Sequence, residues 1–210
     1  MSNILNFSEL ANIERNIVFF NVYDYCGVKG ILKYLNFHNH NVYAYSYDDL
    51  NQSFYNNVFD TKFNLKKFKK YYNILKNLQA KNDLWLKGLT EKRGKYEVLK
   101  FDIKYFNYFD DDWLKICVWR DPVISISLNF FTAESDDQYN INIIKKFKKF
   151  MVDINEYANV ICYDDFLNHL GIDKYTDIDK SVVTREALNY SINLCKQYLN
   201  LNYEVYNELL

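Results

Sequence analysis

NIVFFNVYDYCGVKGILKYLNF, residues 16–37, joins a continuous apolar run to a segment with helical spacing. The apolar run, residues 16–22, is rich in β-branched and aromatic side chains, which predicts a buried strand. Residues 31–37 predict a helix, and Gly27 and Gly30 mark the loop between the two elements. A strand, a glycine-bearing loop and a helix in this order predict the opening of an α/β unit.

The rest of the chain continues this alternation of short apolar runs with amphipathic segments. Further strands are expected at residues 42–47, 96–101, 113–119 and 158–163. Helices are expected at residues 63–80, after Pro122, at 141–157, at 164–171 and from 184 onward, with Asp164 and Asp165 interpreted as a helix N-cap. The pattern predicts an α/β fold with a central parallel sheet flanked by helices. We expect a single domain over residues 1–210, mainly helical from about residue 173.

Composition limits the partners of the 210-residue chain. The net charge of −1 gives no overall basic field for nucleic acid, so an anionic ligand would need a local site. The four cysteines are widely spaced and form no CxxC, which favours buried thiols over a zinc site and fits a reducing cytoplasm. No apolar stretch reaches the length of a membrane span. We therefore expect a cytoplasmic protein with no nucleic-acid partner, no metal and no transmembrane segment.

The first candidate site is the loop after the first buried strand. Its candidate phosphate-binding residues are Tyr25, Cys26, Gly27, Val28, Lys29 and Gly30. A glycine loop that opens onto a helix N-terminus offers unpaired N–H groups to a phosphate, and Lys29 adds a positive charge. The loop matches neither GxxxxGK[ST] nor GxGxxG. The alternative is an ordinary tight turn between a strand and a helix.

The second candidate site is Arg120, which directly follows the expected strand 113–119 and precedes Asp121 and Pro122. Only four arginines occur in the chain, against many lysines. An arginine at this place therefore indicates a need for the planar, bidentate guanidinium, which suits a phosphate. The alternative is a structural ion pair between this arginine and a carboxylate, with Asp121 beside it.

Together, residues 19–35 and 113–131 resemble two elements of the sulfotransferases that use 3′-phosphoadenosine 5′-phosphosulfate. The first element resembles the phosphosulfate-binding loop of that family. The second resembles its strand, Arg-(Asp/Asn)-Pro and helix, in which a serine helps to hold the 3′-phosphate. The family serine position falls on Leu128 here, one residue after Ser127, so the resemblance implies that Ser127 takes this role. Residues 157–172 are similar to the family's later strand and Tyr-Glu-Asp turn.

The chain departs from the family pattern at several positions. Val28 replaces the threonine of the first loop, and Tyr23 and Asp24 replace the basic residue before the glycines. The C-terminal Lys-Gly and Gly-Asp-Trp-Lys segment of the cytosolic branch is absent. A lost hydroxyl and a lost lysine remove charge stabilisation from the leaving phosphate, so these departures affect catalysis more than fold.

The resemblance also implies a base that deprotonates the acceptor. Asp102 occupies the place of a histidine that some members use, and Asp48 lies where others have a glutamate. The candidate catalytic residues are therefore Lys29, Asp102 and Asp48. For each carboxylate the alternative is a solvated or helix-capping role.

The function that the resemblance implies is transfer of a sulfuryl group from 3′-phosphoadenosine 5′-phosphosulfate to a hydroxyl of a carbohydrate, such as a surface polysaccharide. Two alternatives stay open. The triplet Asp110 to Asp112 resembles the metal motif of nucleotide-sugar glycosyltransferases, although it precedes a strand and also fits a turn. A sulfotransferase-like binding module without catalysis is the other. His38 and His40 lack the further ligands that a metal site needs.

Overall fold

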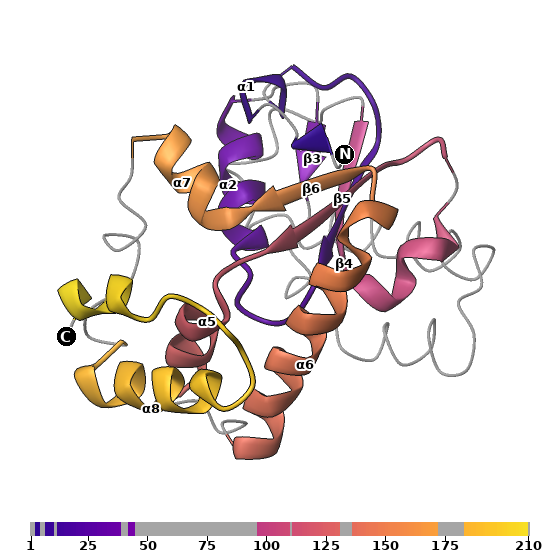
Figure 1. The fold of residues 1–210 in the computed structure, drawn as a ribbon. Coiled ribbons are helices and arrows are strands. Elements are labelled where there is room, and N and C mark those ends of the chain that lie inside the picture. The colour runs from indigo at the N-terminus through magenta and orange to yellow at the C-terminus, as the bar shows by residue number, and fades with distance from the viewer. Residues whose placement is uncertain are drawn as a thin grey trace, which may run out of the picture. The chain divides into compact units, whose positions relative to one another are not determined.

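The structure is a computed structural model that describes residues 3–4, 7–10, 12–38, 42–44, 96–109, 111–130, 136–171 and 183–209. The predicted helix at 63–80, the candidate base Asp48 and His40 lie outside these residues. The strands are β1 (Asn3–Ile4), β2 (Ile17–Asn21), β3 (Val42–Ala44), β4 (Tyr96–Asp102), β5 (Leu114–Trp119) and β6 (Asn159–Cys162). The α-helices are α1 (Phe7–Leu10), α2 (Val28–His38), α5 (Pro122–Asn129), α6 (Asp137–Asp153), α7 (Tyr163–His169) and α8 (Arg185–Lys196) (Figure 1). Short 3₁₀ helices follow at η2 (Ile103–Tyr108), η3 (Ile154–Glu156) and η4 (Glu204–Leu209).

The strands form one six-stranded sheet in the order β1-β6-β5-β2-β4-β3. β1 with β6, β5 with β6, and β3 with β4 pair in parallel. β2 and β5 also run in the same direction, because the Leu114 N–H donates to the Asn16 carbonyl at their start and the Val22 N–H donates to the Val118 carbonyl at their end. The α/β fold with a parallel sheet is therefore confirmed.

Two compact units share the chain. One contains residues 1–7, 21–28 and 116–210, and the other contains residues 8–20 and 29–115. In the first unit, α5 packs against α6 and α8. In the second, Phe20 of β2 contacts Phe106 and Phe109 at ring-centroid distances of 5.1 and 5.5 Å.

α5 is the helix that follows the predicted Arg-Asp-Pro turn. Pro122 lies in its first turn, where a missing N–H costs nothing, and Asp121 caps it by accepting the Val123 N–H at 2.9 Å. Every residue of α5 except Leu128 is buried, including Ser125 and Ser127. A helix that is buried all round belongs to the interior, so α5 is a core element of its unit.

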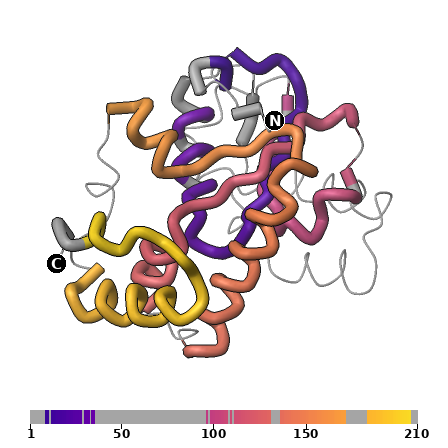
Figure 2. The backbone as a smooth tube through the Cα atoms, viewed as in Figure 1, coloured from indigo at the N-terminus to yellow at the C-terminus, as the bar shows by residue number. Residues whose placement is uncertain are grey.

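α6 and α7 follow the prediction with shifted ends, whereas β1, α1 and η2 were not predicted. α6 begins at Asp137, earlier than expected, because the Asp136 carboxylate caps it by accepting the Tyr139 N–H at 2.6 Å. α7 ends before Gly171, which has a φ of +70°. Within the described residues 183–209, α8 and η4 are helical, and the tube in Figure 2 shows the connection between them returning along α8.

All four cysteines are described and are thiols; three are buried and Cys162 is partly exposed. Among the described residues, no helix combines the length and the apolar character that crossing a membrane would require.

Candidate functional site

The loop between β2 and α2 has an unusual backbone. Tyr25 has a φ of +62° and Gly27 a φ of +88°, so two of three consecutive residues are in the left-handed region. The Cys26 thiol accepts the Tyr23 N–H at 3.3 Å and donates to the Tyr23 carbonyl, which holds the loop closed on itself. A left-handed tyrosine is costly, and such strain persists only where the surrounding structure enforces it. Because α2 begins at Val28, the first N–H groups of that helix follow this loop directly.

Gly27 lies against the ring of Tyr163. A Cβ atom built at position 27 would lie 2.2 Å from Cγ of that tyrosine, well inside any allowed contact. Both the φ angle and this close approach require glycine. The glycine of the predicted loop is therefore placed against the residue that begins α7.

Arg120 is buried, with 3% of its surface exposed, and it extends to the same tyrosine. The carbon atom of its guanidinium lies 5.0 Å from the Tyr163 ring centroid, a cation–π distance. Its Nε donates to Oδ1 of Asp164 at 2.9 Å, and the second oxygen of Asp164 accepts the Asp121 N–H at 3.3 Å. Arg120 and the loop therefore both lie against the same aromatic ring.

The interpretation of Asp164 and Asp165 as an N-cap is wrong. Cys162 occupies the N-cap position of α7 and makes no side-chain cap bond, and Asp164 lies in the first turn. The parallel register pairs Trp119 with Cys162, so Arg120 and Tyr163 follow one residue beyond the strand ends and Asp164 is the next residue after Tyr163. A buried guanidinium needs a carboxylate partner, and this register supplies Asp164 where the sequence suggested Asp121.

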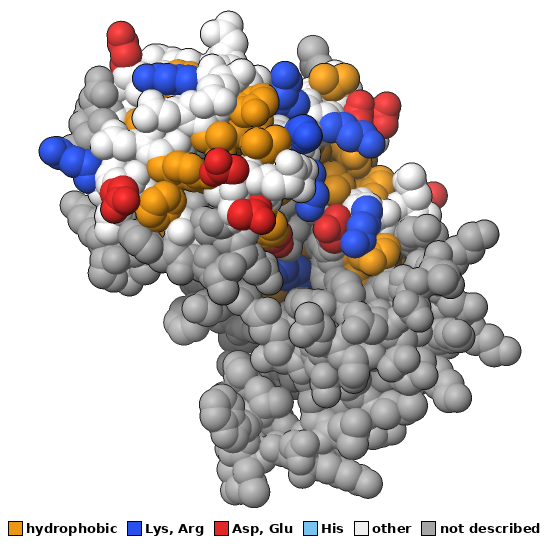
Figure 3. Space-filling model, turned by 90° about the horizontal axis from the view of Figure 1, so that it is seen from below, with side chains coloured by type: hydrophobic (Ala, Val, Ile, Leu, Met, Phe, Trp, Pro, Cys, Tyr) orange, Lys and Arg blue, Asp and Glu red, His pale blue; other side chains and the backbone are white. Residues whose placement is uncertain are grey.

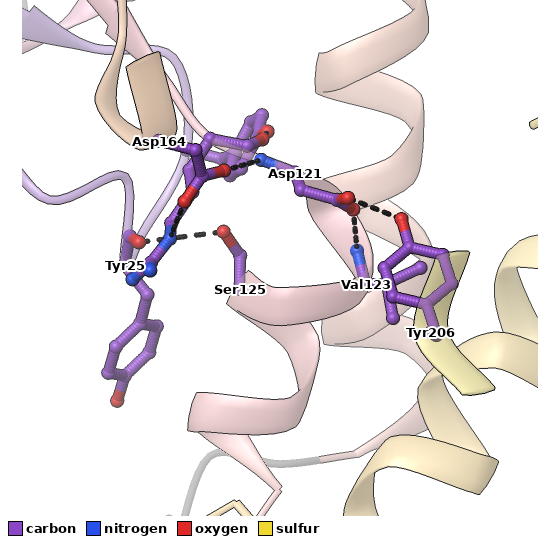
Figure 4. Close-up of polar contacts among 8 residues, drawn as sticks. Tyr25, Asp121, Val123, Ser125, Asp164 and Tyr206 are labelled. Atoms are coloured by element: carbon purple, nitrogen blue, oxygen red, sulfur yellow. Dashed lines mark hydrogen bonds and ion pairs between the residues drawn. The ribbon is translucent and has the colours of Figure 1, made fainter. Parts of the chain in front are cut away.

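Asp121 serves the helix instead. Besides capping α5, its carboxylate accepts the hydroxyl of Tyr206 from η4 (Figure 4). Ser125, one turn after Asp121, has its hydroxyl 3.5 Å from the Tyr25 carbonyl oxygen. Ser125 was not among the ligand-binding residues predicted from the sequence. Its spacing of four residues from the N-cap, on a helix that leaves the Arg-Asp-Pro turn, is the signal that could have found it.

Ser127, the serine that the resemblance selected, has a different neighbourhood. Its hydroxyl oxygen lies 2.8 Å from the Val123 carbonyl and 2.9 Å from the hydroxyl oxygen of Ser191 on α8. Ser127 is fully buried between the two helices. The structure thus brings Ser125, and not Ser127, to the loop.

Tyr23 ties the loop to the arginine turn. Its hydroxyl donates to the Arg120 carbonyl, and its ring packs edge-on against Phe147 of α6. Burial raises the pKa of this phenol well above its ordinary value of 10.0, and Cys26 and Asp121 nearby add to the shift. Tyr23 therefore stays protonated and keeps its role as a donor.

The other predicted site residues belong to the second unit or lie outside the description. Lys29 and Gly30 are in the first turn of α2. Asp102 ends β4 and caps η2 by accepting the Lys104 N–H at 3.0 Å, which is the capping role named as its alternative. Asp48 lies outside the described residues.

In the acidic triplet Asp110 to Asp112, the described residues Asp111 and Asp112 lie in a turn, which was the alternative to a metal motif. Asp111 is exposed, and its carboxylate forms an ion pair with Lys115 at 3.2 Å. Asp112 is exposed as well, and Asp110 lies outside the description. Among the described residues no three His, Cys, Asp or Glu side chains come together in a way that could hold a metal ion.

The charged groups near the loop have different kinds of partner. Arg120 is paired with Asp164, and Asp24 of the loop accepts the hydroxyl of Tyr139. On the face drawn in Figure 3, basic and acidic side chains of the described residues are interspersed among hydrophobic ones. An anion bound at the loop would therefore rely on directed donors, meaning backbone N–H groups and the guanidinium, and not on a broad positive field.

The chain was also compared with known proteins. It matches no family model, no curated protein sequence and no solved structure.

Proposed function

We propose that the protein binds 3′-phosphoadenosine 5′-phosphosulfate and transfers its sulfuryl group to a hydroxyl of a carbohydrate acceptor. One observation supports the proposal: beyond the ends of β2, β5 and β6, Gly27 and Arg120 both lie against Tyr163, and the Ser125 hydroxyl lies 3.5 Å from the Tyr25 carbonyl oxygen of the same loop. In parallel α/β sheets, ligands bind at the carboxyl ends of the strands. Figure 1 shows β5 leading into α5 and β6 into α7 at the same end of the two neighbouring strands.

Each group has a proposed role. The N–H groups after the left-handed turn at Tyr25 and Gly27 would hold the 5′-phosphosulfate, as in other phosphate-binding loops. Arg120 and Ser125 would hold the 3′-phosphate, with Ser125 replacing the serine that the resemblance placed at Ser127. The Nε bond to Asp164 and the Tyr163 ring fix the plane of the guanidinium in advance of binding.

The proposed reaction is a direct displacement at sulfur. The acceptor oxygen forms a bond to the sulfur atom while the bond from sulfur to the phosphate oxygen breaks, and adenosine 3′,5′-bisphosphate leaves. The acceptor proton passes to a base. Asp102 and Asp48 are the sequence-based candidates for the base, and Lys29 is the candidate that stabilises the leaving phosphate.

A second candidate function is a sulfotransferase-like binding module without catalysis. The buried pair of Arg120 and Asp164, with side-chain exposures of 3% and 11%, favours it, because such a pair can be purely structural. Val28 in place of the family threonine favours it too, since the loop then lacks the threonine hydroxyl.

Calorimetric titration of the full chain with adenosine 3′,5′-bisphosphate, with AMP as the matched control, tests the proposal. We expect binding with a clear preference for the bisphosphate. At about a hundredfold excess over the dissociation constant, the bisphosphate should stabilise the fold by about 2.7 kcal/mol. Equal affinity for both nucleotides would remove the 3′-phosphate site, and no affinity for either would reject the proposed function. Bisphosphate binding without sulfate transfer to any of a panel of glycans would favour the non-catalytic module.

A further inference from the structure

The C-terminal segment of the chain reaches the candidate site. Tyr206 of η4 is buried, with 2% of its surface exposed, and its hydroxyl donates to Oδ2 of Asp121, 85 residues earlier in the sequence. The same carboxylate uses its other oxygen, Oδ1, to cap α5. Figure 4 shows the two bonds meeting on Asp121 from different sides.

Asp121 is linked in turn to Arg120 through Asp164. The Asp121 N–H donates to Oδ2 of Asp164 at 3.3 Å, and Oδ1 of Asp164 accepts from Nε of Arg120 at 2.9 Å. Tyr206 is therefore linked to the guanidinium in steps: its hydroxyl holds the Asp121 side chain, the Asp121 backbone N–H holds Asp164, and Asp164 holds Arg120. All of these residues belong to the same compact unit.

These linked contacts have an electrostatic consequence. Arg120 pairs with Asp164, while the carboxylate of its chain neighbour Asp121 accepts the Val123 N–H and the Tyr206 hydroxyl. A carboxylate that already accepts a hydroxyl and a backbone N–H is a weaker competitor for a further donor. With the Tyr206 hydroxyl in place, Asp121 is held on the α5 side and Arg120 is held against Asp164 and Tyr163.

We propose that Tyr206 is a positioning residue for Arg120, and that the C-terminal segment thereby sets the affinity of the site for the 3′-phosphate. This inference rests on the proposed function. Tyr206 acts through Asp121 and touches neither nucleotide nor acceptor in this scheme. Its hydroxyl, and not its ring, is the group that the proposal requires.

The test uses Tyr206→Phe in the full chain, with Tyr203→Phe as the matched control. Tyr203 lies in the same segment, and its hydroxyl donates locally to the Leu199 carbonyl at 3.2 Å. We expect Tyr206→Phe to raise the dissociation constant for adenosine 3′,5′-bisphosphate by about tenfold, the effect of one charge-assisted hydrogen bond, and to leave AMP binding unchanged. Tyr203→Phe should bind the bisphosphate like the wild type.

Asp121→Asn provides the second arm, because asparagine caps a helix as well as aspartate does. In that background the further change Tyr206→Phe should have no additional effect on affinity, since both remove the same interaction. If Tyr206→Phe does not fold, Asp121→Asn alone should reproduce the loss of affinity.

The outcomes separate the two proposals. A lower melting temperature with unchanged affinity would make Tyr206 merely structural and overturn this inference alone. Additive effects of the two substitutions would overturn it as well. A wild-type protein that binds no bisphosphate would overturn the proposed function, and this inference with it.

Discussion

At the scale of single residues, the proposed function depends most on Arg120. Its guanidinium is buried, paired with Asp164 and placed over Tyr163. Arginine presents a rigid fork of donors, whereas lysine presents one compact charge. A substitution that keeps the charge and removes the fork therefore separates ligand binding from charge balance.

We expect Arg120→Lys to weaken binding of adenosine 3′,5′-bisphosphate by at least about tenfold, because a bidentate phosphate contact is lost. The lysine can still neutralise Asp164, so unfolding by urea should change less than in Asp164→Ala, which leaves a buried guanidinium without its carboxylate. Titration calorimetry and urea unfolding of both variants make the comparison. A large loss of stability with unchanged affinity would identify Arg120 as a scaffold residue and favour the non-catalytic module.

Two left-handed glycines of the described residues form a matched pair for a second prediction. Gly27 and Gly171 have φ angles of +88° and +70°, but only at Gly27 would a Cβ meet other atoms. Gly171→Ala should cost about 1 kcal/mol, the price of the φ angle alone. Gly27→Ala should cost more by about 1–3 kcal/mol, because the methyl group also overlaps the Tyr163 ring. Urea unfolding measures both, and equal losses would contradict the close approach of the loop to α7.

At the scale of secondary-structure elements, α5 places two buried serines in different surroundings. Ser125 lies by the Tyr25 carbonyl, and Ser127 lies between α5 and α8 beside Ser191. Ser127→Ala should lower stability by about 1 kcal/mol and leave nucleotide affinity unchanged. Ser125→Ala should weaken bisphosphate binding with a smaller effect on stability. Thermal unfolding measures the stability of the two variants, and calorimetry measures their affinity for the bisphosphate. A loss of affinity in Ser127→Ala would support the phosphate-binding role that the resemblance gave to Ser127.

The elements of the site were predictable to different degrees. Continuous apolar runs identified β2 and β5, and Pro122 identified the start of α5, because these signals are local in sequence. The partner of Arg120 was not predictable, because it depends on the register that pairs Trp119 with Cys162 across two strands far apart in the chain. The contacts of Ser125 and Tyr206 were not predicted from the sequence for the same reason, because their partners lie 100 and 85 positions away.

At the scale of the whole molecule, buried thiols and phenols predict how stability depends on pH. Burial raises the pKa of Cys162 and of Cys195 from 9.0 to about 12, and that of Tyr203 from 10.0 to about 12. The unfolded chain therefore ionises these groups at lower pH than the folded chain. Their contribution to stability is complete below pH 9.0 and is lost as the pH rises toward about 12.

The urea midpoint should accordingly fall steadily above pH 9.0. In Cys195→Ala the fall should be shallower, because one titrating group is gone, even though the loss of a fully buried side chain lowers stability at neutral pH. The slope of the midpoint against pH is the quantity to compare. An identical slope in wild type and variant would show that Cys195 takes no part in the alkaline transition.

The two compact units are interlaced along the chain. The path changes unit at residues 7/8, 20/21, 28/29 and 115/116, and these points fall inside α1, β2, α2 and β5. Neither unit is therefore a contiguous stretch that one cut could release.

The same division has a consequence for synthesis on the ribosome, where the chain emerges from its N-terminus. The glycine loop is translated before residues 29–115 of the other unit, and Arg120, Asp164 and Tyr206 of its own unit follow only after them. A nascent chain stalled before Tyr163 would therefore carry the loop without Tyr163 and Asp164, the ring and the carboxylate that complete its site.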